Sequence, residues 1–151
     1  MKTTQGDLIR LARDGEFDLI VHGCNCFGTM GAGIAKEIKA AFPQAFNADQ
    51  ATARGSKAKL GTCSFAEITA NGKTVIVVNA YTQFDWRGSG PKVEYEAVGS
   101  CMRWIKERFP GKRIGLPRIG AGLAGGDWTI IVAIIDEELA GEDVTLVEYM
   151  P

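Results

Sequence analysis

The stretch Leu116–Trp128 reads LPRIGAGLAGGDW, and an earlier counterpart, Gly23–Ala35, reads GCNCFGTMGAGIA. In both, an apolar run ends in a glycine-rich loop and an amphipathic segment follows. A strand that leads through such a loop into a helix directs several backbone N–H groups toward one point beside the positive end of the helix. Glycine lets phosphate oxygens approach this backbone closely. Two such loops in one small domain predict a ligand with two linked phosphates.

The length and composition of the chain are those of one ordinary globular domain. Its 151 residues can bury a real core, and 46% hydrophobic and 23% charged residues are typical of a soluble protein. Because 17 Lys and Arg residues stand against 18 Asp and Glu, the net charge is −1, and no basic excess predicts bulk nucleic-acid binding or a membrane surface. We interpret the basic clusters Arg54–Lys59 and Arg103–Arg113 as solvated faces.

The cysteines predict buried, reduced thiols. There are four, Cys24, Cys26, Cys63 and Cys101, and the chain has a single histidine, so a zinc site lacks partners and no metal is expected. The N-terminus has no apolar signal core, and no segment approaches the ~20 apolar residues of a membrane span. We therefore expect a cytoplasmic protein without membrane contact.

Apolar patterning predicts alternating strands and helices. The predicted strands cover residues 1–5, 17–25, 61–69, 74–80, 113–117 and 143–150, and the predicted helices cover 8–12, 31–42, 44–53, 92–109 and 128–139. Asn71-Gly72 between two apolar runs predicts a hairpin. Tyr81–Pro91 is a long loop, either functional or a mobile surface excursion. This order favours a mixed, largely parallel sheet with helices on both faces and ligands at the carboxyl ends of the strands.

Several common phosphate-binding and hydrolase motifs are missing. The chain has no GxxxxGK[ST] and no GxSxG, and the glycines of Gly28–Gly33 lack the dinucleotide-fold spacing. The single histidine also makes a Ser-His-Asp triad unsupported.

Four segments in their order along the chain resemble a known family. Gly6-Asp7-Leu8, IVHGCN ending at Asn25, MGAGIA and LPRIGAGLAGGDW are together similar to the motifs of macrodomains, over about residues 6–149. The resemblance implies a single macrodomain over residues 1–151, with a three-layer α/β/α fold, a mixed sheet of about six strands, and ADP-ribose bound between the two glycine loops. The HGCNCFGTMGAGIA stretch most resembles the subgroup of ADP-ribose-1''-phosphate phosphatases, which includes small phage, bacterial and yeast proteins.

The resemblance also implies roles for individual residues. Asp7 matches the acidic residue that accepts from the adenine amino group, with Gly6 and Leu8 beside it, although Asp7 could equally cap a short helix. Asn25, after Gly23 and Cys24, matches the asparagine that bonds the distal ribose, and Tyr149 is a candidate to cover the adenine. The first loop contributes Met30, Gly31, Ala32, Gly33, Ile34 and Ala35. The second contributes Ile119, Gly120, Ala121, Gly122, Leu123, Ala124, Gly125 and Gly126.

His22 and Asp127 are the candidate catalytic residues, because they are the titratable groups closest in sequence to the expected distal ribose. Either could orient water or protonate a leaving oxygen. The alternatives are a core imidazole for His22 and a helix N-cap for Asp127.

The expected function is binding of ADP-ribose and hydrolysis of ADP-ribose-1''-phosphate to ADP-ribose and phosphate, by a monomer without a cofactor. Two alternatives stay open: a binding module without turnover, or a hydrolase that removes ADP-ribose from protein or nucleic acid. Relatives that cleave such linkages use a lysine absent from Asn79–Pro91, or an acidic residue where this chain has Ala124. These two absences disfavour a lysine-dependent glycohydrolase.

Overall fold

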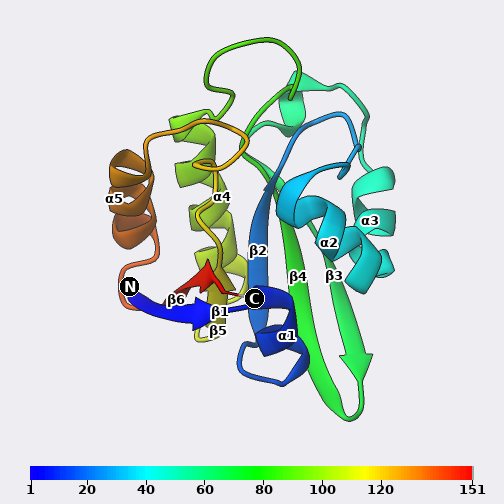
Figure 1. The fold of residues 1–151 in the computed structure, drawn as a ribbon, viewed down its shortest axis with the longest axis vertical. Helices are drawn as coiled ribbons and strands as arrows, with labels where there is room; N and C mark the ends of the chain where they lie inside the picture. The colour runs from blue at the N-terminus through cyan, green and yellow to red at the C-terminus, as the bar shows by residue number, and fades with distance from the viewer. Residues whose placement is uncertain (151) are drawn as a thin grey trace.

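The computed structural model describes residues 1–150, which form a six-stranded sheet between two layers of helices (Figure 1). In chain order the elements are β1 (Lys2–Gly6), α1 (Leu8–Arg13), β2 (Leu19–Cys24), α2 (Gly33–Ala41), α3 (Pro43–Gln50), the short 3₁₀ helix η1 (Lys57–Lys59), β3 (Cys63–Ala70), β4 (Lys73–Tyr81), α4 (Tyr95–Arg108), β5 (Arg113–Leu116), α5 (Trp128–Glu138) and β6 (Asp143–Tyr149). No helix among these is long and apolar enough to cross a membrane.

The sheet has the strand order β1-β6-β5-β2-β4-β3. All neighbouring strands run parallel except β3 and β4, which pair antiparallel as a hairpin. The predicted Asn71-Gly72 turn joins them, and both residues have a positive φ, 54° and 75°, as a two-residue hairpin turn of this kind requires. The predicted α/β/α fold with a mixed six-stranded sheet is therefore confirmed.

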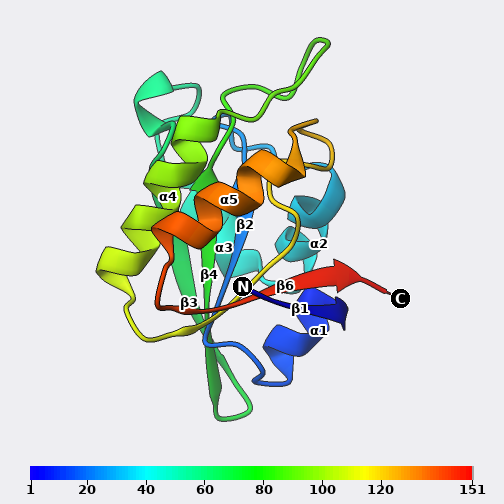
Figure 2. The ribbon, with the colours of Figure 1, turned by 90° about the vertical axis from the view of Figure 1, so that its left-hand side faces the viewer.

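Alternation along the central strands divides the core into two layers. Leu19 and Val21 point toward α4 and α5, whereas Ile20 points toward α1, α2 and α3. In β4, Ile76 and Val78 face the first side and Val77 the second. The view turned by 90° shows α4 and α5 side by side on their face of the sheet (Figure 2). Because alternate side chains of these strands are buried on opposite faces of the sheet, the strand sequences are nearly continuous apolar runs.

Two helices start later than the sequence pattern predicts, and one of them, predicted over 31–42, begins at Gly33. The predicted helix 92–109 begins only at Tyr95, because the N–H groups of Lys92 and Val93 donate to the carbonyl of Ala124, at 2.6 and 3.4 Å. Val93 also forms an isolated bridge with Gln83. The second glycine loop therefore holds these residues extended, and Val93 packs beneath that loop rather than on a helix.

Candidate functional site

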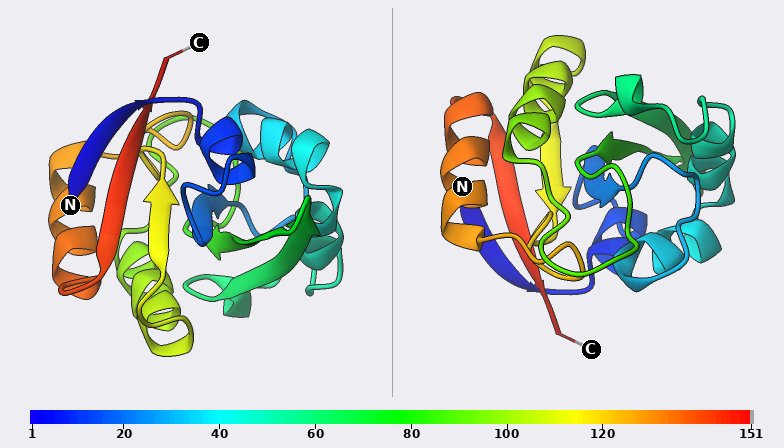
Figure 3. Two further views of the ribbon diagram at one scale, coloured as in Figure 1. Left: turned by 90° about the horizontal axis from the view of Figure 1, so that it is seen from below. Right: turned by 90° about the horizontal axis from the view of Figure 1, so that it is seen from above.

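The loops that follow β2, β4 and β5 gather at the carboxyl ends of these parallel strands (Figure 3, right). They surround a cavity of about 770 Å³. A cavity of this size suits a small-molecule ligand, and its place matches the usual ligand position in parallel α/β sheets.

The first glycine loop ends in a helix whose N-terminus is open. Ala32 is the N-cap residue of α2, and its side chain makes no capping hydrogen bond. The N–H groups of Gly33, Ile34 and Ala35 belong to the first turn, so they have no carbonyl partner within the helix. All three residues line the cavity. An anion placed there would meet three donors and the positive end of the helix dipole.

The second loop also offers free donors, but from the loop itself. The N–H groups of Gly122, Leu123 and Ala124 donate to no other residue within 1–150, and all three residues line the cavity. The loop is closed by the N–H of Gly126, which donates to the carbonyl of Gly120 at 2.7 Å. Its tight form needs glycine at 126, because a Cβ there would come within 2.6 Å of the Gly120 carbonyl oxygen.

The helix after the second loop is capped, unlike α2. Asp127 is the N-cap of α5, and its Oδ1 accepts from the N–H of Thr129 at 2.9 Å. The Asp127 N–H donates to the Tyr95 hydroxyl oxygen at 3.1 Å. The capping alternative for Asp127 is thus confirmed, and the expected positive helix end is available at the first loop only.

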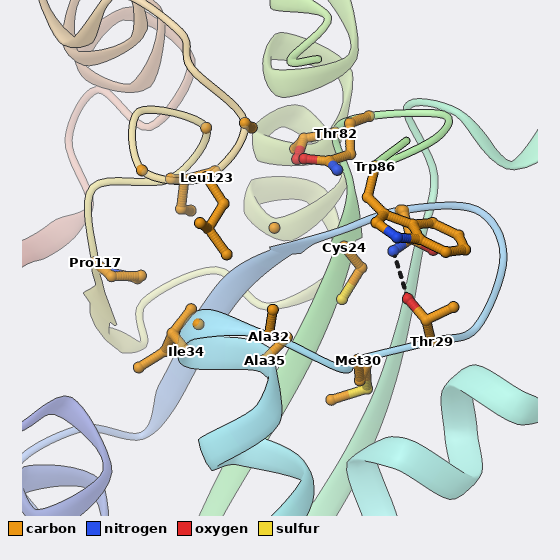
Figure 4. A pocket seen from close by; sticks show the side chains of 18 of the residues that line it. Cys24, Thr29, Met30, Ala32, Ile34, Ala35, Thr82, Trp86, Pro117 and Leu123 are labelled. Atoms are coloured by element: carbon orange, nitrogen blue, oxygen red, sulfur yellow. Dashed lines mark hydrogen bonds between the residues drawn. The ribbon is translucent and has the colours of Figure 1, made fainter. Parts of the chain in front are cut away.

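The two loops meet across the cavity through Leu123. Its side chain is 79% exposed, and its Cδ1 lies 3.2 Å from the point where a Cβ on Gly33 would stand. The close-up shows Leu123 above Ile34 and Ala32, with Pro117 on one side of the cavity and Trp86 on the other (Figure 4). A ligand bound between the loops would lie under this side chain.

Asn25 is held by its own loop. Its Nδ2 donates to Thr29 Oγ1 at 2.7 Å, the bond that is dashed at Thr29 in Figure 4. Its Oδ1 accepts from the Phe27 N–H at 2.8 Å. Each of these atoms retains one further hydrogen-bonding position. The side chain is therefore fixed in place and can still both donate to and accept from a diol.

A chain of buried hydrogen bonds runs beneath the cavity, on the α3 side of the sheet. The distances are 2.7 Å from His22 Nε2 to Asn79 Oδ1, 3.0 Å from Asn79 Nδ2 to Ser64 Oγ, 2.8 Å from Ser64 Oγ to Tyr81 Oη, and 2.6 Å from Tyr81 Oη to Asp49 Oδ1. It links two buried side chains at its ends, His22 and Asp49, of which Asp49 lines the cavity.

The direction of this chain follows from the donors available. Asn79 Nδ2 also donates to the Ala45 carbonyl, so Asn79 Oδ1 is the acceptor for His22 and the proton lies on His22 Nε2. Burial raises the pKa of the Tyr81 hydroxyl, which stays protonated and donates to Asp49. Each of the four hydrogen bonds in this chain is therefore donated in the direction of the Asp49 carboxylate. Its other oxygen, Oδ2, is buried and has no hydrogen-bond partner within residues 1–150.

His22 and Cys24 are both neutral at physiological pH. Burial lowers the pKa of His22 to about 4, although the hydrogen bond to Asn79 opposes this. Burial likewise raises the pKa of the Cys24 thiol well above its ordinary value. Cys24 Sγ lies 3.6 Å from His22 Nε2 and itself lines the cavity, so Cys24 stands between His22 and a ligand.

Charge is sparse at the cavity. Of the residues within 1–150 that line it, only Asp49 and Arg118 are charged, and Arg118 is paired with Glu148 at 2.6 Å. No group of three or more His, Cys, Asp or Glu side chains in this part of the chain is placed to hold a metal ion.

The structure brings most of the predicted loop residues to one cavity. Those that line it are Gly23, Cys24, Asn25, Met30, Gly31, Ala32, Gly33, Ile34, Ala35, Ile119, Gly120, Gly122, Leu123 and Ala124. Outside its lining lie Gly6, Asp7, Leu8, Ala121, Gly125, Gly126 and Tyr149, together with both candidate catalytic residues, His22 and Asp127. The ligand-binding and catalytic roles of all these residues stay predictions.

Asp7 and Tyr149 lie together, beyond one end of the cavity. Gly6 of β1 pairs in register with Tyr149 of β6, and Tyr149 is 68% exposed. Asp7 is the N-cap of α1, and its Oδ1 accepts from the N–H groups of both Ile9 and Arg10. The capping alternative for Asp7 is confirmed, and this geometry leaves Oδ2 for another donor.

Sequence reasoning missed several residues of the cavity wall, notably Asp49, Thr82, Gln83 and Trp86. The last three belong to the long loop after β4, whose length was the available signal. Asp49 lies within α3, and its position in the sequence carries no comparable signal.

Comparison with known proteins identifies the family. The macrodomain family model matches residues 21–135. The chain belongs to the macrodomain family. A relative from Enterobacteria phage T4, an uncharacterized 17.5 kDa protein, is 37% identical over all of this macrodomain and 97% of its own length.

Other relatives have named activities. A DNA ADP-ribosyl glycohydrolase from Mycobacterium bovis is 27% identical over 82% of this macrodomain, which spans about a third (34%) of that protein. An ADP-ribose 1''-phosphate phosphatase from Aspergillus oryzae is 47% identical, over 31% of this macrodomain and 22% of the phosphatase.

A solved structure supports the fold. The DarTG protein of Thermosipho africanus in complex with ADP-ribose superimposes with a TM-score of 0.74 at 21% identity, over the whole of this macrodomain and 42% of that chain.

Proposed function

We propose that this macrodomain binds ADP-ribose, with the diphosphate between Gly33–Ala35 and Gly122–Ala124. The observation that carries the proposal is the set of free backbone N–H groups that the two loops direct at one cavity. Six such donors and the positive end of α2 can hold a diphosphate without a lysine or arginine. The ADP-ribose in the similar Thermosipho africanus structure supports this choice of ligand.

The adenine belongs at the side of β1 and β6. There, Asp7 Oδ2 accepts from the exocyclic amino group and Tyr149 covers the base. The distal ribose then belongs at the other end, where Asn25 bonds its hydroxyls. The free position on each polar atom of Asn25 supports this role.

The reaction we propose is the hydrolytic removal of a group attached at C1'' of the distal ribose, which releases ADP-ribose. Two attached groups are candidates. Phosphate is supported by the short match to the ADP-ribose 1''-phosphate phosphatase, and a nucleobase by the longer match to the DNA ADP-ribosyl glycohydrolase.

The charges at the distal end favour the nucleobase. A phosphate monoester there would meet backbone donors and polar side chains, but the one Lys or Arg among the described lining residues, Arg118, is paired with Glu148, and the Asp49 carboxylate, which also lines the cavity, would repel it. A neutral base meets no such repulsion. Because Asn79–Pro91 contains no lysine, such a glycohydrolase would use groups other than a lysine. His22 and Asp127 lie outside the cavity lining, so either could act on the substrate only through a neighbouring group.

The test is one protein sample with three substrates. ADP-ribose is titrated by calorimetry, and product chromatography then follows ADP-ribose-1''-phosphate and a single-stranded DNA that carries one ADP-ribose on a base. We expect binding, with release of ADP-ribose from the DNA. Release of phosphate instead would favour the phosphatase, and binding without either product a non-catalytic module. The absence of ADP-ribose binding would refute the proposal.

A further inference from the structure

Three aromatic rings form a platform at the end of the cavity farthest from Asp7. Phe27 meets Phe84 with ring centroids 5.0 Å apart and Trp86 at 5.9 Å, both edge to face. The Arg87 guanidinium lies over Trp86, 4.7 Å from its ring centroid, and over Phe27 at 5.0 Å. We call Phe27, Phe84 and Trp86 the aromatic platform.

The platform is supported by neighbouring contacts and is partly exposed. Asp85 accepts from Arg87 Nε at 3.0 Å and from Nη2 at 2.9 Å, and the carbonyl of Phe84 accepts from the Cys26 N–H at 2.9 Å. Nevertheless Trp86 is 45% exposed and lines the cavity. A large aromatic ring that packs against a neighbouring ring, lines a cavity and leaves nearly half its surface in water is typical of a contact surface for a ligand.

Strand order places the platform beyond the distal ribose. Asp7 follows β1 and Trp86 follows β4, and the order β1-β6-β5-β2-β4 puts four strand spacings between them. At ~4.8 Å per spacing, that separation is about 19 Å. With the adenine at Asp7 and the diphosphate between the loops, Trp86 faces whatever is attached to C1''.

Basic side chains border the platform. The segment Arg54–Lys59 packs against it: the Gly55 N–H donates to the Cys26 carbonyl at 2.7 Å, and a Cβ on Gly55 would touch the Phe27 ring at 3.2 Å. Arg54 and Lys57 are exposed, and Lys57 Nζ lies 5.2 Å from the Phe84 ring centroid. The sequence alone suggests that the cluster Arg54–Lys59 is a solvated face. In the structure this cluster lies beside the aromatic platform.

We propose that the aromatic platform binds a nucleobase of a single-stranded nucleic acid that carries ADP-ribose, and that Arg54 and Lys57 face the phosphates of that strand. An aromatic face stacks on any base but offers nothing to a phosphate monoester, and adjacent cations track a phosphate backbone. The inference rests on the proposed ADP-ribose site and names the class of substrate that this site receives.

The first test compares three probes at low temperature: ADP-ribose, a single-stranded DNA pentanucleotide with one ADP-ribose on a base, and an ADP-ribosylated peptide. Competition binding should give at least a tenfold tighter Kd for the DNA than for ADP-ribose. In Trp86→Ala this ratio of Kd values should fall by roughly tenfold, the range of one lost stacked base, and Trp86→Phe should restore most of it.

The second test measures the salt dependence of DNA binding. Lys57→Gln should reduce the slope of log K against log [salt] by about one, or slightly less, as expected for one phosphate contact. Lys106→Gln is the matched control, because Lys106 Nζ contacts the Ala140 carbonyl on the far layer of helices. An unchanged slope in Lys57→Gln would count against the proposed strand path.

The remaining outcomes distinguish failure of this inference from failure of the proposed function. ADP-ribose that binds while the DNA binds no tighter would overturn the inference alone. An equal gain for the peptide would overturn the choice of nucleic acid. Failure of ADP-ribose itself to bind would overturn the proposed function and the inference together.

Discussion

His22 shows how burial decides the chemistry of a single residue. Its ring is fully buried and donates to Asn79, which begins the directed chain of hydrogen bonds that ends at Asp49. A neutral imidazole is the form that this environment stabilises, because burial outweighs the one favourable contact. The same burial makes protein stability depend on pH.

We predict that stability falls as the pH drops from 6.5 to 4. In this range the unfolded imidazole binds a proton, whereas the folded one, with its pKa lowered to about 4, does not. The free energy of unfolding should be about 3 kcal/mol lower at pH 4 than above pH 6.5. Urea unfolding at several pH values measures it, and His22→Gln should flatten the slope. Asp18 and Asp85, whose pKa values are lowered from 3.8 to about 2, lose most of their contribution below pH 4, between these two pKa values. An unchanged slope in the variant would contradict the assignment to His22.

Substitutions at Asp127 distinguish a role in capping α5 from a role in catalysis. Asp127→Ala should lower the free energy of unfolding by about 1 kcal/mol, because the Thr129 N–H loses its acceptor. Asp127→Asn should keep this stability, since asparagine caps a helix equally well. Turnover measured in Asp127→Asn then tests the catalytic prediction alone: a loss at unchanged stability would support it, and full activity would leave capping as the role.

At the scale of elements, the loop Gly120–Gly126 depends on where a side chain can fit. A Cβ on Gly126 would lie 2.4 Å from Val93 Cγ1 and 2.6 Å from the Gly120 carbonyl oxygen. A Cβ on Gly122 would meet nothing within 4 Å. A side chain at position 126 would therefore clash with its neighbours, whereas one at position 122 would not.

We predict that Gly126→Ala destabilises the protein by about 1–3 kcal/mol and weakens ADP-ribose binding, because the loop must open to admit the methyl group. Gly122→Ala, the control in the same loop, should change stability by less than about 0.5 kcal/mol. Chemical denaturation and calorimetry of both variants measure this. Equal stability of the two variants would show that the tight closure of the loop is unimportant.

Elements with local chemical signals could be predicted from the sequence. Asn71-Gly72 specifies its hairpin by itself, and the two glycine loops appear at the carboxyl ends of strands as predicted. The start of α4 could not be predicted, because the carbonyl of Ala124, which lies far along the chain, holds Lys92 and Val93 extended. Asp49 and Trp86 were missed for the same reason. Only the folded chain brings α3 and the loop after β4 to the cavity.

At the scale of the whole molecule, the parallel sheet brings three loops to one edge. The first loop supplies an open helix end, the second supplies loop N–H groups, and the loop after β4 supplies an aromatic ring. The buried polar chain lies under them on the α3 side. We propose that backbone donors, with few side-chain charges, hold the diphosphate of ADP-ribose.

Amide chemical shifts in a ¹⁵N-labelled sample, titrated with ADP-ribose, ADP and adenosine, test whether these backbone groups hold the diphosphate. We predict that the largest shifts occur at Gly33, Ile34, Ala35, Gly122, Leu123 and Ala124 with both ADP-ribose and ADP, and that adenosine leaves these amides nearly unchanged. Adenosine shifting the same amides as strongly, or ADP-ribose leaving them unmoved, would contradict the account.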